Sequence, residues 1–118
     1  KMNTAIFFKH YMICALWSST AGSGDPLDEN YDVEDLTEDA RAMMLEDCES
    51  FVVDNINDLE GNVTNEQAGH DFWLTRNGHG AGFWDRGLGE VGKRLTEACA
   101  PYGSQDLYMG DDGKLHIQ

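Results

Sequence analysis

Apolar residues recur at helical spacing in three stretches of the chain. Thr4 to about Ser18 is apolar on most sides, which predicts a helix lying centrally in the core. Leu88 to about Ala100 carries apolar residues at intervals of three and four, which predicts the last helix. Asp35 to about Asn55 predicts a further helix, with a stripe at the same spacing formed by Ala40, Met43, Met44, Cys48 and Phe51.

Capping signals and strand-forming residues add detail between these helices. Asp35 and Glu38 have the spacing of a capping box and predict the start of the second helix. Thr64–Gln67 (TNEQ) is another such box and predicts a single helical turn. His70–Arg76 is rich in strand formers, and the turn signal Asn77-Gly78 follows it, so we expect a strand there.

The segment Asp106–Gln118 (DLYMGDDGKLHIQ) predicts a β-hairpin whose register can be derived. A two-residue loop would pair Met109 with His116 and mix apolar and polar side chains on one face. A three-residue loop pairs Met109 with Leu115 and places four apolar side chains together. We therefore expect the three-residue loop, with Gly113 in the left-handed conformation.

These elements predict an α+β fold, with about three helices packed on a small antiparallel sheet that ends in the C-terminal hairpin. A chain of 118 residues fits one domain, 1–118. Within it, 1–24 is the buried N-terminal helix and a linker, and 25–60 is an acidic segment that contains the second helix. Residues 61–118 hold an aromatic and glycine-rich block, the last helix and the hairpin.

Two features indicate a protein that is neither secreted nor inserted in a membrane. The longest uninterrupted apolar run near the N-terminus, Tyr11–Trp17, is too short for a membrane span and a poor secretion signal. Cys14, Cys48 and Cys99 are widely spaced and form no CxxC motif. We expect buried free thiols in a reducing compartment.

Charge narrows the range of partners. The chain has 22 acidic and 8 basic residues, a formal charge of −14. Duplex nucleic acid and anionic membranes are disfavoured as direct partners, because phosphate contacts need Lys and Arg. A protein with a basic surface is favoured, although the charge also serves solubility without any partner.

The acidic residues concentrate between Asp25 and Glu60, where fourteen of them accompany one basic residue, Arg41. At about 100° per residue, four fall within an arc of about 100° on the second helix, over about 16 Å of its length. These four are Glu38, Asp39, Glu46 and Glu49. The row could imitate nucleic-acid phosphates in a basic protein groove, or it could be an ordinary solvated helix face.

The segment His70–Gly87 (HDFWLTRNGHGAGFWDRG) concentrates aromatic, charged and glycine residues. Trp and Arg anchor binding hot spots, and glycine lets a backbone approach a ligand closely. The candidate binding residues are His70, Asp71, Trp73, Arg76, Asn77, His79, Trp84, Asp85 and Arg86. Alternatively, the aromatic residues pack in the core, the glycines form turns, and the Asp and Arg residues pair with each other.

The sequence gives weaker evidence for catalysis or metal binding than for a binding surface. The ligand types suited to zinc or another divalent ion are His70, Asp71, His79 and Asp85, but their spacing matches no standard pattern. The sequence GHGAG lacks the lysine of a phosphate-binding P-loop. We expect no metal and no cofactor; enzyme activity stays open, with its absence favoured.

Most of the chain resembles a family of small bacteriophage-encoded proteins that have no assigned function. The resemblance is most specific over Gln67–Gly113, where HDFWLTRN and HGAGFWDRG form the signature of that family. ALWSST (Ala15–Thr20) and PLDENYDVEDL (Pro26–Leu36) are similar too. The resemblance implies action inside an infected bacterial cell, in agreement with free cysteines, and supplies no catalytic residues.

We therefore expect a phage-encoded, non-enzymatic accessory protein of the host bacterial cytoplasm that binds a host or phage macromolecule. Phages direct small acidic proteins against host enzymes and defence systems, some of them by imitating DNA, so by analogy inhibition of a host nucleic-acid-binding or defence protein is one version of this function. One alternative binds a small ligand or single-stranded nucleic acid by stacking on Trp73 and Trp84. Another is a metal-dependent enzyme. The sequence does not decide between monomer and dimer.

Overall fold

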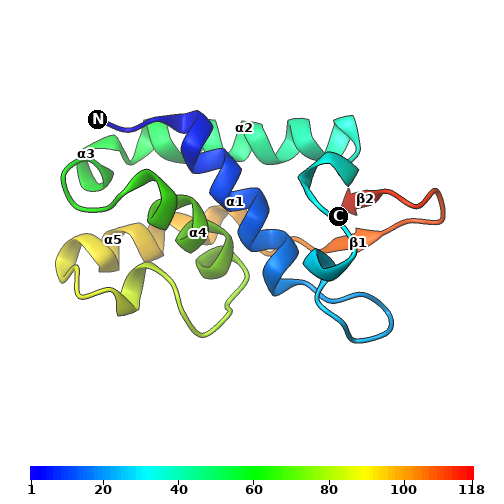
Figure 1. Cartoon of the computed structure of the whole chain (residues 1–118). Helices are drawn as coiled ribbons and strands as arrows, with labels where there is room; N and C mark the ends of the chain where they lie inside the picture. Colours follow the sequence, from blue (N-terminus) through cyan, green and yellow to red (C-terminus); the bar gives the residue numbers. More distant parts are fainter.

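Helices form most of the molecule, and a short hairpin closes one end (Figure 1). The computed structural model describes all residues, Lys1–Gln118, in a body of 42 × 25 × 22 Å. The helices and strands are α1 (Thr4–Ser18), α2 (Glu38–Asp54), α3 (Ile56–Leu59), α4 (Asn65–Arg76), α5 (Glu90–Cys99), β1 (Leu107–Met109) and β2 (Leu115–Ile117). Short 3-10 turns are η1 (Leu27–Glu29), η2 (Val33–Asp35), η3 (Phe83–Asp85) and η4 (Ala100–Tyr102). Helix α2 runs along one long side, with α3 and α5 at one end of the molecule and the hairpin at the other (Figure 1).

Helix α1 lies in the centre of the fold, as its apolar sequence predicts. The Asn3 side chain caps it by accepting a hydrogen bond from the Ile6 amide at 3.2 Å. Its most extensive contact is with α4. The two backbones approach so closely that a β-carbon at Gly69 would overlap the Phe7 carbonyl oxygen, so the packing requires glycine there.

Helix α2 is confirmed, but its start differs from the prediction. The N-cap is Thr37, whose hydroxyl accepts a hydrogen bond from the Ala40 amide at 3.0 Å. Asp35 instead closes the preceding turn η2, where its carboxylate accepts from the Asp32 amide at 2.9 Å. The predicted capping box of Asp35 and Glu38 is therefore wrong, because Asp35 is already engaged in the turn before the helix.

The segment predicted to be a strand, His70–Arg76, is helical and completes α4. Thr64 caps this helix as predicted, but the helix continues for three turns instead of ending after one. Ala68, Phe72 and Arg76 recur every four residues and are all buried. Burial of this face against α1 outweighs the strand preference of the aromatic residues.

The C-terminal hairpin has the predicted register. Met109 lies opposite Leu115, and Gly113 adopts a left-handed conformation with a φ of +77°. Strand β2 is also tied to the start of α2, because the Thr37 amide donates to the Leu115 carbonyl at 3.0 Å. These two strands are the whole sheet, since no third strand joins them.

The α+β class is confirmed, with five α-helices rather than about three. The additional helices are α4, expected as one helical turn followed by a strand, and the single turn α3. Aromatic rings from α1, α2 and α4 form the centre of the core, where Phe51 and Phe72 stack with centroids 4.2 Å apart. No helix combines the length and the apolar character needed to cross a bilayer.

Candidate functional site

The nine candidate residues of the His70–Gly87 segment do not form one surface. Because α4 is a helix, successive side chains point in different directions around its axis. One residue, Arg76, lies in the core, and Trp84 is exposed on the turn η3. The others form two groups: His70, Asp71, Asp85 and Arg86 in one, and Trp73, Asn77 and His79 in the other.

Arg76 is a buried structural residue, so the prediction of a surface anchor is wrong. Its side chain is only 2% exposed. The guanidinium donates to the Asp47 carboxylate at 2.8 Å and to the Tyr11 hydroxyl at 3.0 Å. It also donates to the carbonyl oxygens of Tyr102 and Gly103, each at 2.8 Å. One side chain thus ties α4 to α1, to α2 and to the segment that follows α5.

Asp71 and Arg86 form an ion pair, which is the structural alternative that the sequence left open. Asp71 is fully buried and accepts from Arg86 Nη2 at 2.9 Å and from Nε2 of the Gln67 side chain at 2.9 Å. The hydrogen bond to Asp71 raises the pKa of Arg86 above its ordinary value. Asp85 lies 3.7 Å from Arg86 Nε and accepts from the Gly82 amide at 3.1 Å. These contacts fasten the glycine-rich loop to α4.

His70 borders a shallow pocket of about 320 Å³, which is lined by His10, Glu66, Gln67, His70 and Arg86. Its ring packs against the exposed Trp17, with centroids 5.8 Å apart. The buried Nδ1 of His70 has no hydrogen-bond partner and lies 3.7 Å from Asp71 Oδ1. No three potential metal-ligating side chains come together anywhere in the chain, so the constellation considered for a divalent ion is not assembled.

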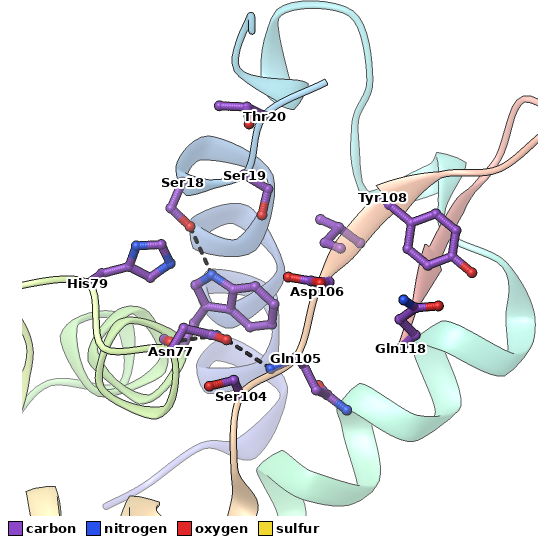
Figure 2. A pocket seen from close by; sticks show the side chains of 12 residues that line it. Ser18, Ser19, Thr20, Asn77, His79, Ser104, Gln105, Asp106, Tyr108 and Gln118 are labelled. Carbon is purple, nitrogen blue, oxygen red and sulfur yellow. Dashed lines mark hydrogen bonds between the residues drawn. The ribbon is translucent and has the colours of Figure 1, made fainter. Parts of the chain in front are cut away.

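Trp73, Asn77 and His79 line a polar pocket of about 560 Å³ between the ends of α1 and α4 and the segment that leads into β1 (Figure 2). Trp73 is buried, and its indole nitrogen donates to the Ser18 hydroxyl at 2.8 Å. Asn77 accepts from the Gln105 amide at 2.8 Å. His79 is exposed. We refer to this site as the polar pocket.

Most of the lining of the polar pocket was not among the predicted site residues. Two polar runs, Ser18–Thr20 and Ser104–Asp106, supply much of it. Each run follows the end of a helix, and that position is the one local signal they carry. Their meeting depends on how α1 packs against α4, which no local pattern of residues specifies.

The exposure of the tryptophans contradicts a stacking surface made by Trp73 and Trp84. Trp84 is 56% exposed, but Trp73 is 1% exposed and lies under the surface. Arg76, which would have stood beside it, is buried as well. Stacking of nucleic-acid bases needs open aromatic faces, and Trp73 presents none.

The three cysteines are free and buried, as predicted. Burial raises the pKa of Cys14 and of Cys99 to about 12. Burial also raises the pKa of Cys48 well above its ordinary value. The thiols are therefore protonated at neutral pH, and none is activated as a nucleophile.

The acidic row of α2 is ordered and open to solvent. All four of its carboxylates are exposed, and none takes part in a hydrogen bond or ion pair: Glu38, Asp39, Glu46 and Glu49. Arg41, the one basic residue of the acidic segment, lies 3.8 Å from Glu34 instead. We call these four residues the acidic face.

Comparison with protein-family models, curated proteins and solved structures gives no significant match. The resemblance to phage-encoded proteins therefore stays an expectation from the sequence. Two features of the structure are open to solvent and organised by its elements: the acidic face and the polar pocket.

Proposed function

We propose that this protein is a non-enzymatic binding protein that docks its acidic face on a basic surface of a partner protein. One observation carries this proposal: α2 presents four exposed carboxylates on one ordered face, and none of them forms an ion pair within the chain, although Lys114 borders the same hollow as Glu38 and Asp39. Like charges repel one another and cost the free protein stability. A partner that supplies the opposite charge removes this repulsion, and the complementary charges increase the rate of association.

Exposed apolar side chains within and beside the same face favour a protein partner. Val53 is 70% exposed, and Met43, which the apolar stripe predicts to be buried, is 48% exposed. At about 100° per residue, Ala42 and Val53 fall between Glu46 and Glu49 around the helix. Exposed apolar side chains next to charged ones are typical of protein–protein interfaces.

The buried charged groups and the cysteine thiols are not available for catalysis. Asp71 and Arg76 use their charges on partners inside the protein. The cysteine thiols are held in their protonated form. A general base or nucleophile needs a free, correctly protonated group within reach of a substrate, and none of these groups is free in that sense.

The resemblance to phage proteins extends the proposal to a partner class. We propose a host or phage protein with a basic groove, such as a nucleic-acid-binding or defence protein of the host bacterial cytoplasm. The acidic face spans about 16 Å of helix, along which carboxylates would replace phosphates. Occupation of the groove would then block its nucleic acid.

The test compares two variants of equal net charge. E38K/D39K/E46K/E49K reverses the acidic face and changes the formal charge from −14 to −6. The control E29K/E60K/E97K/D111K makes the same change at exposed acidic residues scattered elsewhere. Immobilised wild-type protein and both variants are exposed to bacterial extract at low and high salt, and the retained proteins are identified.

We expect proteins that are retained by the wild type and the control, are lost from the acidic-face variant, and elute as salt rises. Identical retention by the two variants would contradict the proposal. Lysine at Glu38 and Asp39 also opposes the helix dipole at the start of α2. E46K/E49K, in the middle of the helix, therefore serves as a second variant, with circular dichroism to verify folding.

A further inference from the structure

We propose that the polar pocket binds a small, hydroxyl-rich ligand that carries an amino group, for which an amino sugar is the simplest example. This inference is independent of the acidic face, because it rests on different residues. Its grounds are the rigidity of the pocket, its unpaired polar groups and the sign of its charge.

Hydrogen bonds within the protein hold the walls of the pocket in place. The Ser18 hydroxyl donates to the Cys14 carbonyl at 2.8 Å and accepts from Trp73 Nε1 at the same distance. Asn77 accepts from the Gln105 amide and donates to the Trp73 carbonyl at 3.0 Å. The ends of α1 and α4 are thus joined to the segment before β1, and a ligand would not have to order them.

Other side chains of the lining have no partner within the protein. Ser19, His79 and Asp106 surround the same hollow (Figure 2). None of them makes a side-chain hydrogen bond or an ion pair, and the same is true of Thr20 and Ser104. Hydroxyl, imidazole and carboxylate groups around one hollow match a ligand with several hydroxyl groups.

Charge selects a ligand with a positive group. Helix C-termini carry partial negative charge, and two of them, from α1 and α4, meet at this pocket. The last turn of α1 has no basic residue, and Arg76 in the last turn of α4 is turned into the core. The lining includes the Asp106 carboxylate but no Lys or Arg. An amine is therefore favoured and a phosphate disfavoured.

Size excludes a simple ion as the natural occupant. A hollow of about 560 Å³ lies within the range of about 300–1,000 Å³ found for small-molecule sites. An amine alone would leave most of the hydroxyl groups of the lining without a partner. A ring that bears both hydroxyl groups and an amine uses both properties of the pocket.

The experiment is an NMR titration of the full chain with glucosamine, glucose, glucose 6-phosphate and putrescine. The indole N–H signal of Trp73 reports on the pocket, and W17F and W84F assign the signals of the two exposed tryptophans. D106N removes the carboxylate, which makes no contact that folding needs. D111N makes the same charge change at an exposed residue of the hairpin loop.

We expect glucosamine to shift the Trp73 signal saturably, glucose to bind more weakly, and glucose 6-phosphate to bind least. D106N weakens glucosamine binding about tenfold or more, the effect of one hydrogen bond between charged groups, and D111N leaves it unchanged. The proposal is overturned if glucosamine causes no saturable shift. It is also overturned if glucose 6-phosphate or putrescine binds as tightly as glucosamine. Equal losses in D106N and D111N would also overturn it.

Discussion

Two arginines of the aromatic and glycine-rich segment, Arg76 and Arg86, form ion pairs within the protein instead of lying on a binding surface. Arg76 is directed into the core toward Asp47, and Arg86 returns from the loop to Asp71 on α4. Arginine suits both positions, because its planar group donates several hydrogen bonds in fixed directions. Pairing between Asp and Arg residues of the segment can be proposed from the sequence. The pair with Asp47 could not, since 29 residues separate it from Arg76.

Replacement of Arg76 should show that it is structural. R76M leaves the Asp47 carboxylate and the carbonyls of Tyr102 and Gly103 without their donor, so we expect a loss of about 3–5 kcal/mol in the free energy of unfolding. Urea denaturation measures it. R94M breaks the exposed pair with Asp58 and should change stability little. Similar small losses in both variants would contradict the role assigned to Arg76.

The cysteines make stability depend on alkaline pH. Folding raises the thiol pKa of Cys14 and Cys99 from an ordinary value of 9.0 to about 12. Above pH 9 the unfolded chain loses thiol protons that the folded chain keeps, so stability falls as pH rises from 9 toward 12. Thermal unfolding across this range tests the trend.

A thiol reagent at pH 8 should modify the cysteines in denaturant but not in the folded protein; rapid modification of the folded protein would refute this.

At the scale of elements, local signals predict the start of α4 and the hairpin, but they miss the start of α2 and the helical continuation of α4. The Thr64 cap and the Met109–Leu115 pairing depend on residues close in sequence, and both are confirmed. The identity of His70–Arg76 depends on burial against α1, a distant part of the chain. Strand formers placed on a buried helical face are therefore misread when only local preference is considered.

The close approach of α1 and α4 gives a test at this scale. Alanine normally stabilises a helix by about 1 kcal/mol relative to glycine. At Gly69 the added methyl group would meet the backbone of Phe7, so G69A should instead destabilise the protein by about 1–3 kcal/mol. G22A, where a β-carbon meets nothing within 4 Å, is the control. Stabilisation by G69A in a chemical denaturation experiment would show that the helices are less closely packed.

At the scale of the whole molecule, periodicity predicts the acidic face and packing creates the polar pocket. Glu38 and Glu49 share a face because a helix repeats every 3.6 residues, so their exposure follows once α2 is predicted. The pocket joins Ser18, Asn77 and Asp106, which come from three separate parts of the chain. Only the packed structure brings them together, which is why sequence patterns point to the acidic face and miss most of the pocket.

The most direct measurement of the central claim is the affinity for a purified partner captured as described, with the acidic-face variant and its charge-matched control side by side. Titration calorimetry at two salt concentrations gives the dissociation constants. Reversal of the acidic face should weaken binding about 100-fold or more, because each lysine would face a basic surface. The control should bind within about threefold of the wild type, since peripheral charges contribute little. Equal weakening in both variants, or none in either, would contradict the claim that α2 presents the binding surface.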